Sequence, residues 1–222
     1  MLSITSLISL LTETWLSKES AEFCNLDGYN VYHPVHAGRM GGGLAIFCSR
    51  KIISKKLLHL CISIDKIEAC VVELVFCDVN LIILCVYRPH SDTISNFDVI
   101  LIGLLHHHSL TSQNIIIISD FNINLLSDCL QTEMFRLNLQ SLHFLPVITK
   151  PNRFSHTDHR HVSAPSLLNH ILINFDLTFI SGILYSDITD DFPTFLLFRL
   201  AHNMSQKVRS TGMWSFSVVS DF

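Results

Sequence analysis

A run of four consecutive isoleucines at positions 115–118 constrains the fold of this chain more than any other feature. Such a run has no polar face, so it is expected to form a strand that is covered on both faces of a sheet. The run ends in Ser119, Asp120, Phe121 and Asn122. Two polar side chains, Asp120 and Asn122, are therefore expected to emerge two residues apart at the rim of that sheet.

The pair Asp120 and Asn122 has two interpretations. An aspartate at a sheet rim can orient or deprotonate a water molecule, and a neighbouring asparagine can donate a hydrogen bond to a phosphoryl oxygen. Alternatively, the two residues form an Asx turn with a structural role. Their position directly after a buried strand favours the first interpretation.

Short apolar segments rich in β-branched residues predict further strands. Together with the isoleucine run they cover residues 3–11, 43–48, 69–76, 81–87, 114–119, 167–173 and 192–198. Apolar residues at helical spacing in 96–107 and 130–144 predict two helices packed on a sheet. A short polar link between 69–76 and 81–87 indicates antiparallel as well as parallel pairing. The pattern favours an α/β sandwich over a doubly wound parallel fold.

Length and composition predict one domain over residues 1–200 and a tail at 201–222 without a convincing pattern. The chain has 222 residues, of which 49% are hydrophobic, enough for a large core. A net charge of -4 with 15 lysines and arginines gives no general basic field, so any DNA contact has to be local. The mean hydropathy of +0.40 is high for a soluble chain and indicates a shortage of polar surface.

Seven cysteines lie mostly within apolar runs and form no Cys-x-x-Cys pair. We therefore expect buried free thiols in a reducing, intracellular compartment, nuclear or cytoplasmic rather than secreted. The apolar start at residues 1–11 lacks the basic residues of a signal peptide and runs into Glu13, so a core strand is expected there. No apolar run approaches the about 20 residues of a membrane span, and no membrane partner is expected.

Further polar clusters end other apolar segments, where the active sites of sheet proteins are usually assembled. Glu13 can bind a hard cation such as Mg²⁺, or it is a solvated turn residue. Tyr87 and Arg88 can both donate to phosphate; alternatively, Tyr87 belongs to the core and Arg88 forms a structural ion pair. The clusters at 166–171 and 189–193, taken in isolation, are polar turns.

Six short motifs occur in one order along the chain. They are Glu-Thr-Trp (13–15), Gly-Gly-Gly-Leu-Ala-Ile (41–46), Tyr-Arg-Pro (87–89), Ser-Asp-Phe-Asn (119–122), Ser-Leu-Leu-Asn-His-Ile (166–171) and Asp-Asp-Phe-Pro (190–193). In this order they resemble the endonuclease/exonuclease/phosphatase superfamily, and more closely the endonuclease domain of LINE-type (non-LTR) retrotransposons. The resemblance extends over residues 7–197. It gives the glycines a structural turn, and no Gly-Lys-Ser/Thr follows them as in a phosphate-binding loop.

The resemblance implies a four-layer sandwich of two mixed β-sheets flanked by helices, and hydrolysis of DNA phosphodiesters with Mg²⁺ or Mn²⁺ and no small-molecule cofactor. Glu13 matches the metal-binding glutamate, and Asp190 matches an aspartate beside the metal. Tyr87 matches a tyrosine that contacts phosphate. Asp120 matches the aspartate that activates the attacking water, and Asn122 matches its phosphate-binding neighbour.

Three departures from the family pattern predict catalytic damage. Asp191 stands where the family has a histidine, and Asn169 stands where the family has the aspartate that orients that histidine. A carboxylate at this place repels the negative charge of the transition state, whereas an imidazolium offsets it. The family also begins with a strand that carries a metal-site asparagine. Only 12 residues precede Glu13 here, so a missing first strand and an exposed sheet edge are expected.

The sequence therefore predicts a degenerate metal-dependent DNA endonuclease domain with little or no activity, because losing a positioned acid or base lowers the rate by about 10² to 10⁴. A translated retroelement fragment without a selected function is one alternative. A non-catalytic binding module is another, although the few basic residues disfavour DNA as its partner. A transition-metal site at histidines 106–108 or at His156, His159 and His161 is a further alternative, but consecutive histidines cannot all face one ion.

Overall fold

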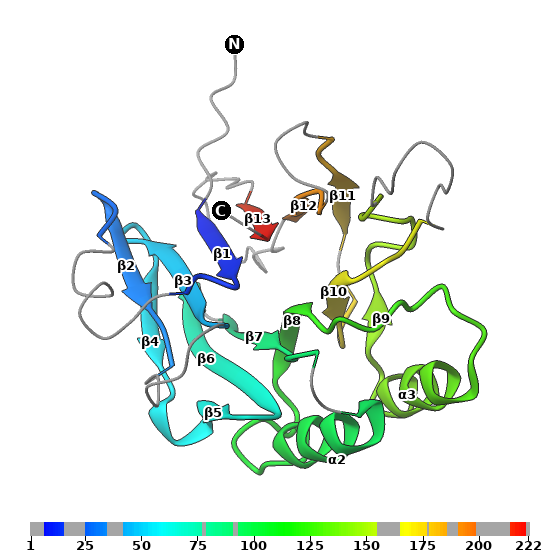
Figure 1. The fold of residues 1–222 in the computed structure, drawn as a ribbon. Helices are drawn as coiled ribbons and strands as arrows, with labels where there is room; N and C mark the ends of the chain where they lie inside the picture. Colours follow the sequence, from blue (N-terminus) through cyan, green and yellow to red (C-terminus); the bar gives the residue numbers. More distant parts are fainter. Residues whose placement is uncertain are drawn as a thin grey trace.

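Two mixed β-sheets face each other and carry the core between them (Figure 1). The structure is a computed structural model. It describes residues 7–15, 25–34, 42–76, 79–90, 93–154, 165–176, 178–185, 191–198 and 214–220, the last of these as backbone only. Each predicted strand and both predicted helices overlap an observed element, and the expected α/β sandwich is confirmed.

The larger sheet has seven strands in the order β4-β6-β7-β8-β10-β9, with β5 paired to β6. Their bounds are β4 (Ile53–Lys56), β5 (Ile62–Ile64), β6 (Ile67–Phe76), β7 (Val79–Tyr87), β8 (Asn114–Asp120), β9 (Leu145–Pro146) and β10 (Asn169–Ile173). Strands β6 and β7 are antiparallel, whereas β7 and β8 are parallel. The isoleucine run forms β8 in the interior of this sheet, where its side chains are buried. The prediction for this run is confirmed.

The smaller sheet has six strands in the order β11-β12-β13-β1-β3-β2. Their bounds are β1 (Ile8–Thr12), β2 (Tyr29–Tyr32), β3 (Leu44–Ser49), β11 (Phe179–Ile183), β12 (Thr194–Phe198) and β13 (Trp214–Ser220). Strand β13 is antiparallel to β12 on one side and parallel to β1 on the other. It is therefore a central strand, although it comes last in the described sequence.

Two expectations about the smaller sheet differ from the structure. The tail 201–222 was expected to have no pattern, but its residues 214–220 form β13; the alternation of apolar residues with serine in Trp214-Ser215-Phe216-Ser217 has the period of a strand. An exposed sheet edge is also expected, where the opening strand of the family pattern is missing. Instead, β1 pairs with β3 on one side and β13 on the other, because strands distant in sequence close around it.

Helices α2 (Ile94–Leu105) and α3 (Leu130–Ser141) lie side by side on the side of the larger sheet away from β1 and β13 (Figure 1). Thr93 starts α2 by accepting a hydrogen bond from the backbone of Asn96. Ring contacts between Phe97, Phe121 and Phe135 join the two helices to the end of β8. The expected four-layer sandwich has helices on both outer sides. The described residues contain one of these two helical layers, formed by α2 and α3.

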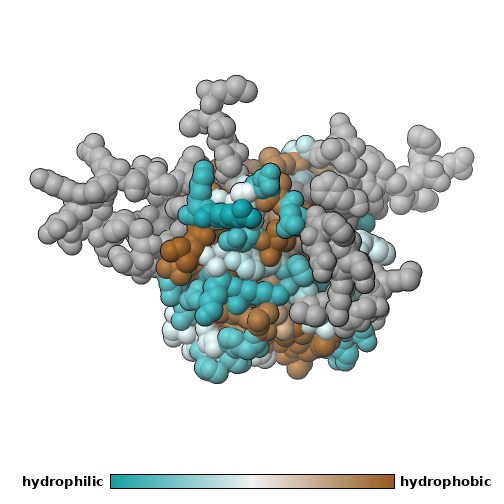
Figure 2. Space-filling model, turned by 90° about the vertical axis from the view of Figure 1, so that its left-hand side faces the viewer, coloured by the Kyte–Doolittle hydropathy of each residue, from teal (hydrophilic) through white to brown (hydrophobic). Residues whose placement is uncertain are grey.

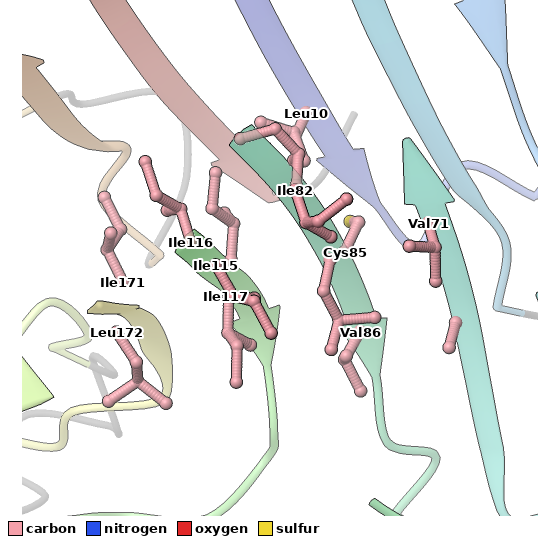
Figure 3. Close-up of a cluster of buried hydrophobic side chains, with 14 of the residues drawn as sticks. Leu10, Val71, Ile82, Cys85, Val86, Ile115, Ile116, Ile117, Ile171 and Leu172 are labelled. Carbon is pink, nitrogen blue, oxygen red and sulfur yellow. The ribbon is translucent and has the colours of Figure 1, made fainter. Parts of the chain in front are cut away.

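The buried core runs from β1 across the larger sheet to the helices (Figure 3). Leu10 of β1 lies on one side, and Ile82, Ile116 and Ile171 come from three neighbouring strands of the larger sheet. Figure 2 shows the side of the molecule that carries β2 and β4, where hydrophilic surface separates smaller apolar patches. No helix in the described part is long and apolar enough to cross a membrane.

The cysteines in the described ranges are all free thiols, but they are not all buried as expected. Cys48, Cys70 and Cys85 are buried, Cys61 is half-buried and Cys129 is exposed at the start of α3. The exposed cysteine follows a polar segment rather than an apolar run, which explains the difference. Cys24 and Cys77 lie outside the described residues.

Val218→Pro tests whether β13 belongs to the folded domain. Proline cannot donate to the sheet ladder and is excluded from central strands, and Val218 pairs with Leu10 and Thr194. We expect the free energy of unfolding in urea to fall by roughly 3 kcal/mol. Val218→Thr keeps the N–H and the β-branch and is the control. Equal stability of the two variants would place β13 outside the cooperative domain.

Candidate active site

Four polar residues form one row across the larger sheet. Tyr87 of β7 is in register with Asp120 of β8, and Asn169 of β10 is in register with the same aspartate. On the other side, Glu68 of β6 is opposite Tyr87. Residues paired across neighbouring strands project from the same face, and all four are buried. Strand pairing thus brings side chains from four distant segments to one rim.

The smaller sheet contributes Glu13, directly after β1. The Tyr87 hydroxyl donates a 2.7 Å hydrogen bond to Glu13 Oε1, so the two sheets meet at this contact. Glu13 and Trp15 both have positive φ, 53° and 51°, which is strained for residues with a side chain, by about 1 to 2 kcal/mol each. Surrounding contacts must therefore hold this turn.

Burial of Tyr87, together with the hydrogen bond to Glu13, raises the pKa of its phenol well above the ordinary value. The nearby carboxylates of Glu13, Asp120 and Glu68 act in the same direction. The phenol therefore stays protonated and remains a hydrogen-bond donor. This is the state that contact with a phosphate oxygen requires.

A glycine turn holds the Glu13 segment in place. The backbone N–H groups of Thr14 and Trp15 donate to the carbonyls of Gly43 and Gly42, at 3.3 and 2.8 Å. Both glycines have positive φ, 80° at Gly42 and 102° at Gly43, which supports the structural role expected for this turn; Gly41 lies outside the described residues. A Cβ at Gly42 would lie 2.6 Å from Glu68 Oε1.

Sequence reasoning missed Glu68. Its buried carboxylate accepts a 3.0 Å hydrogen bond from Gly43 N, so it connects the row on the larger sheet to the glycine turn. The one signal was that β6 carries two acidic residues, Glu68 and Glu73, among apolar ones, and the sequence does not show which of them is buried. A buried carboxylate needs partners, and such a residue therefore marks a position with a specific contact.

The segment after β8 forms the Asx turn that the sequence analysis gives as the structural alternative for Asp120 and Asn122. Asn122 N donates to Asp120 Oδ1 at 3.0 Å, which is the Asx turn, and Asn122 Nδ2 donates to the carbonyl of Arg88 at 2.8 Å. The guanidinium of Arg88 donates to the carbonyls of Phe121 and Asn122, both at 2.6 Å. Arg88 thus binds the loop that presents Asp120 instead of pointing toward a phosphate.

The two residues that depart from the family pattern lie close together. Asn152 joins their segments, because its Nδ2 donates to the carbonyl of Asn169 at 2.5 Å and its carbonyl accepts from Phe192 N at 2.7 Å. Asp191 Oδ2 forms an ion pair with Arg153 Nη1 at 3.2 Å. Sequence reasoning missed Arg153, which lies in a polar stretch with no pattern. Asp190, the other predicted metal-site residue, lies outside the described residues.

His170 follows Asn169 but points away from the row, because neighbouring residues of a strand face opposite sides. It is buried and stacks on Phe121 with ring centroids 5.1 Å apart, and its Nε2 lies 3.2 Å from the Ile123 carbonyl. Burial lowers the pKa of His170 to about 3, against a smaller opposing effect of the Ile123 contact. It is a neutral core histidine and does not replace the family's catalytic one.

Metal-binding groups are sparse in the described part of the chain. No cluster of three or more histidine, cysteine, aspartate or glutamate residues there is arranged to hold a metal ion. The rings of His107 and His108 lie 4.3 Å apart, and His59 lies 5.8 Å from His107. His156 and His159 lie outside the described residues, as does His161, so that cluster has no structural account.

The fold is similar to that of solved proteins described as an endonuclease domain and as endonuclease/exonuclease/phosphatase family proteins. A scan against protein-family models gives no match, and neither does a sequence search of curated proteins. The predicted resemblance is confirmed by solved structures, at the level of the fold.

One such structure is the endonuclease domain of TRAS1, a telomere-specific non-LTR retrotransposon, with 12% identity and a TM-score of 0.64 over 89% of this chain and 99% of that one. The AP endonuclease of Leishmania major has 12% identity and a TM-score of 0.64, over 85% and 77% of the two chains. The catalytic domain of Xenopus laevis APE2 has 16% identity and a TM-score of 0.60, over 97% and 85%.

Gly42→Ala and Gly28→Ala form a matched pair, because both glycines have φ near the same positive value, 80° and 84°. A Cβ at Gly28 meets nothing within 4 Å, whereas one at Gly42 meets Glu68 Oε1. We expect Gly28→Ala to lower the free energy of unfolding by about 1 kcal/mol and Gly42→Ala by roughly 2 kcal/mol more, as measured in urea. Equal losses would mean that the turn is not packed against Glu68.

Stability should fall in acid because of His170. Its folded-state pKa of about 3 is below the ordinary histidine value of 6.5, so the unfolded chain binds the proton first. The contribution of neutral His170 to the free energy of unfolding is complete above pH 6.5 and is lost as pH decreases toward 3. The loss is on the order of 3 kcal/mol by about pH 4. His170→Gln should flatten this part of the urea-unfolding profile. An exposed control, His90→Gln, should keep it; a native profile in His170→Gln would exclude this histidine as the cause.

Proposed function

We propose that this chain is a degenerate copy of a metal-dependent DNA endonuclease domain with little or no nicking activity. One observation carries the proposal: Tyr87 donates to Glu13 Oε1 while it is in register with Asp120 on the neighbouring strand. An acid at a strand end, a neutral phenol and a second carboxylate at the rim are the groups that phosphodiester hydrolysis needs.

Each remaining residue has a proposed role in this site. Asp120 accepts a proton from the attacking water or orients it. The single phenol hydrogen of Tyr87, which Glu13 accepts in this structure, is proposed to turn to a phosphate oxygen once Glu13 holds a metal ion. Asn122 already donates one amide hydrogen to the Arg88 carbonyl; its second amide hydrogen is the one proposed for phosphate. Arg88 positions both through the carbonyls of the Asp120 loop.

Glu13 is the described residue proposed to hold Mg²⁺ or Mn²⁺. Such ions accept one or two protein carboxylates and complete their coordination with water and phosphate oxygens, so a half-buried glutamate at a strand end fits. A bound ion would offset negative charge on the phosphate. Asp190 stays the second proposed ligand.

The proposed loss of activity follows from Asn169 and Asp191. Neither side chain can become an imidazolium, so the positive charge that the family places beside the scissile phosphate is missing. The ion pair with Arg153 reduces the expected repulsion between Asp191 and the phosphate, because it compensates part of the Asp191 charge. We therefore attribute the defect more to the lost acid than to repulsion by Asp191.

DNA is the proposed partner, on the basis of the fold shared with nucleases. One solved relative, zebrafish (D. rerio) TDP2, is described as complexed with a single-strand DNA product. The net charge of -4 means that binding here has to depend on local contacts. Weak binding with a strong dependence on salt is the expected behaviour.

Nicking of supercoiled plasmid in Mg²⁺ and in Mn²⁺ tests the proposal. The native chain should show little or no nicking, and Asn169→Asp with Asp191→His should increase the rate by about 10². Arg153 loses its partner in this variant, but its side chain is 34% exposed and can turn to solvent. Glu13→Gln in the double variant should abolish the gain and weaken Mn²⁺ binding measured by calorimetry.

The outcomes separate the alternatives. Nicking by the native chain that Glu13→Gln removes would contradict the proposed damage. A double variant that melts cooperatively but neither nicks nor binds Mn²⁺ would contradict the proposed metal site. Loss of cooperative melting in the native chain would favour a fragment without a selected function.

A further inference from the structure

Three cysteines form a second row on the larger sheet, next to the polar row. Cys70 of β6 is in register with Cys85 of β7. Cys61 immediately precedes β5, whose antiparallel register with β6 pairs Ile62 with Ala69, so one step further places Cys61 opposite Cys70. Residues opposite each other on antiparallel strands project from the same face. The three thiols are therefore neighbours on one face of the sheet.

The geometry of the Cys61 and Cys70 pair suits a disulfide. Opposed residues in antiparallel strands have Cα atoms about 4.5 to 5.5 Å apart, and disulfides need about 4.4 to 6.8 Å. Val71 N donates to Cys61 Sγ at 3.5 Å, which places this sulfur at the backbone of the residue after Cys70. Little movement is needed to join the two sulfurs.

The environments of the two thiols are unequal. Cys61 is half-buried and can be reached from solvent, whereas Cys70 is buried. The hydrogen bond from the Cys70 thiol, followed by the Val71 N–H and the charge of Lys56, holds the pKa of the Cys61 thiol below its ordinary value despite partial burial. The same hydrogen bond and its own burial raise the pKa of Cys70 well above the ordinary value. Lys56 is itself held by a hydrogen bond to the His33 carbonyl.

We propose that Cys61 and Cys70 form a peroxide-reactive pair that closes to a disulfide between the start of β5 and β6. The thiolate of Cys61 attacks hydrogen peroxide, the O–O bond breaks, and Cys61 becomes a sulfenic acid while hydroxide leaves and takes up a proton as water. The sulfur of Cys70 then attacks the Cys61 sulfur and loses its proton. The S–O bond breaks and a second water leaves, so two thiols are oxidised and one peroxide is reduced.

The other thiols in the described ranges are poor candidates for this reaction. Cys85 is fully buried, and burial followed by the charge of Glu68 raises the pKa of its thiol. Cys85 is shielded from peroxide, and it is the thiol that competes with Cys61 for a disulfide bond to Cys70. Cys129 is exposed at the start of α3, and Thr132 lowers its pKa to about 7. It can react, but the hydrogen bonds of its thiol within the described ranges are with Ser127, Gln131 and Thr132, none of them a cysteine.

The oxidised pair would lie close to the candidate active site. Cys70 is two residues after Glu68 on the same face of β6, and Glu68 holds the glycine turn through Gly43 N. A covalent link to β5 stiffens the strand that carries Glu68. This oxidation site does not depend on the nuclease proposal, because its reactivity is a property of the thiols alone.

Peroxide treatment followed by peptide mapping tests the proposal on the full chain. After blocking free thiols, trypsin cleaves at Lys56 and Lys66 and isolates Cys61, and a glutamyl endopeptidase cleaving at Glu68 and Glu73 separates Cys70 from the other cysteines. We expect a linked Cys61 and Cys70 peptide that dithiothreitol removes. Cys61 should be oxidised roughly threefold faster at pH 7 in the folded chain than in urea, because its larger thiolate fraction outweighs the lower nucleophilicity of that thiolate.

Variants make the result decisive. Cys70→Ser should leave Cys61 as a sulfenic acid that dimedone traps, Cys61→Ser should remove the linked peptide, and Cys85→Ala should leave it unchanged. Cooperative melting of each variant shows that it is folded. A link between Cys70 and Cys85, or a Cys61 that reacts no faster in the folded chain than in urea, would overturn the proposal.

Discussion

The need to cover a strand of consecutive isoleucines on both faces shapes this molecule. Strand β8 has β7 on one edge and β10 on the other, helices α2 and α3 on one side and the smaller sheet on the opposite side. Its register with these neighbours is fixed by burial, since a slip by one residue would turn every side chain to the other face. Tyr87 and Asn169 flank Asp120 as a direct result.

Buried carboxylates at the rim persist because each has a specific partner. Glu13 accepts from Tyr87, Glu68 from Gly43 N and Asp120 from Asn122 N. Burying a charge without such contacts is strongly unfavourable. The same principle applies to Arg153, whose guanidinium pairs with the buried carboxylate of Asp191. The candidate site is thus held by a consistent set of specific contacts.

Thiols repeat this pattern two residues further along the sheet. Cys70 and Cys85 occupy neighbouring strands as Glu68 and Tyr87 do, because side chains on one face of a strand repeat every two residues, and Cys61 directly precedes β5. The proximity of the three thiols does not by itself show which of them is reactive. Their differing exposure, and the backbone N–H and lysine near Cys61, separate a reactive thiol from two buried ones.

The sequence by itself determined the buried strands, the two amphipathic helices and the position of Asp120 and Asn122 at the end of the isoleucine strand, because these depend on local periodicity. Tertiary structure alone decided that Tyr87 meets Glu13 across two sheets, that Arg88 binds the Asp120 loop, and that residues 214–220 form a central strand. The roles of Glu68 and Arg153 likewise could not be predicted from local sequence patterns. Their partners lie far away along the chain, and only long-range pairing of strands brings such atoms together.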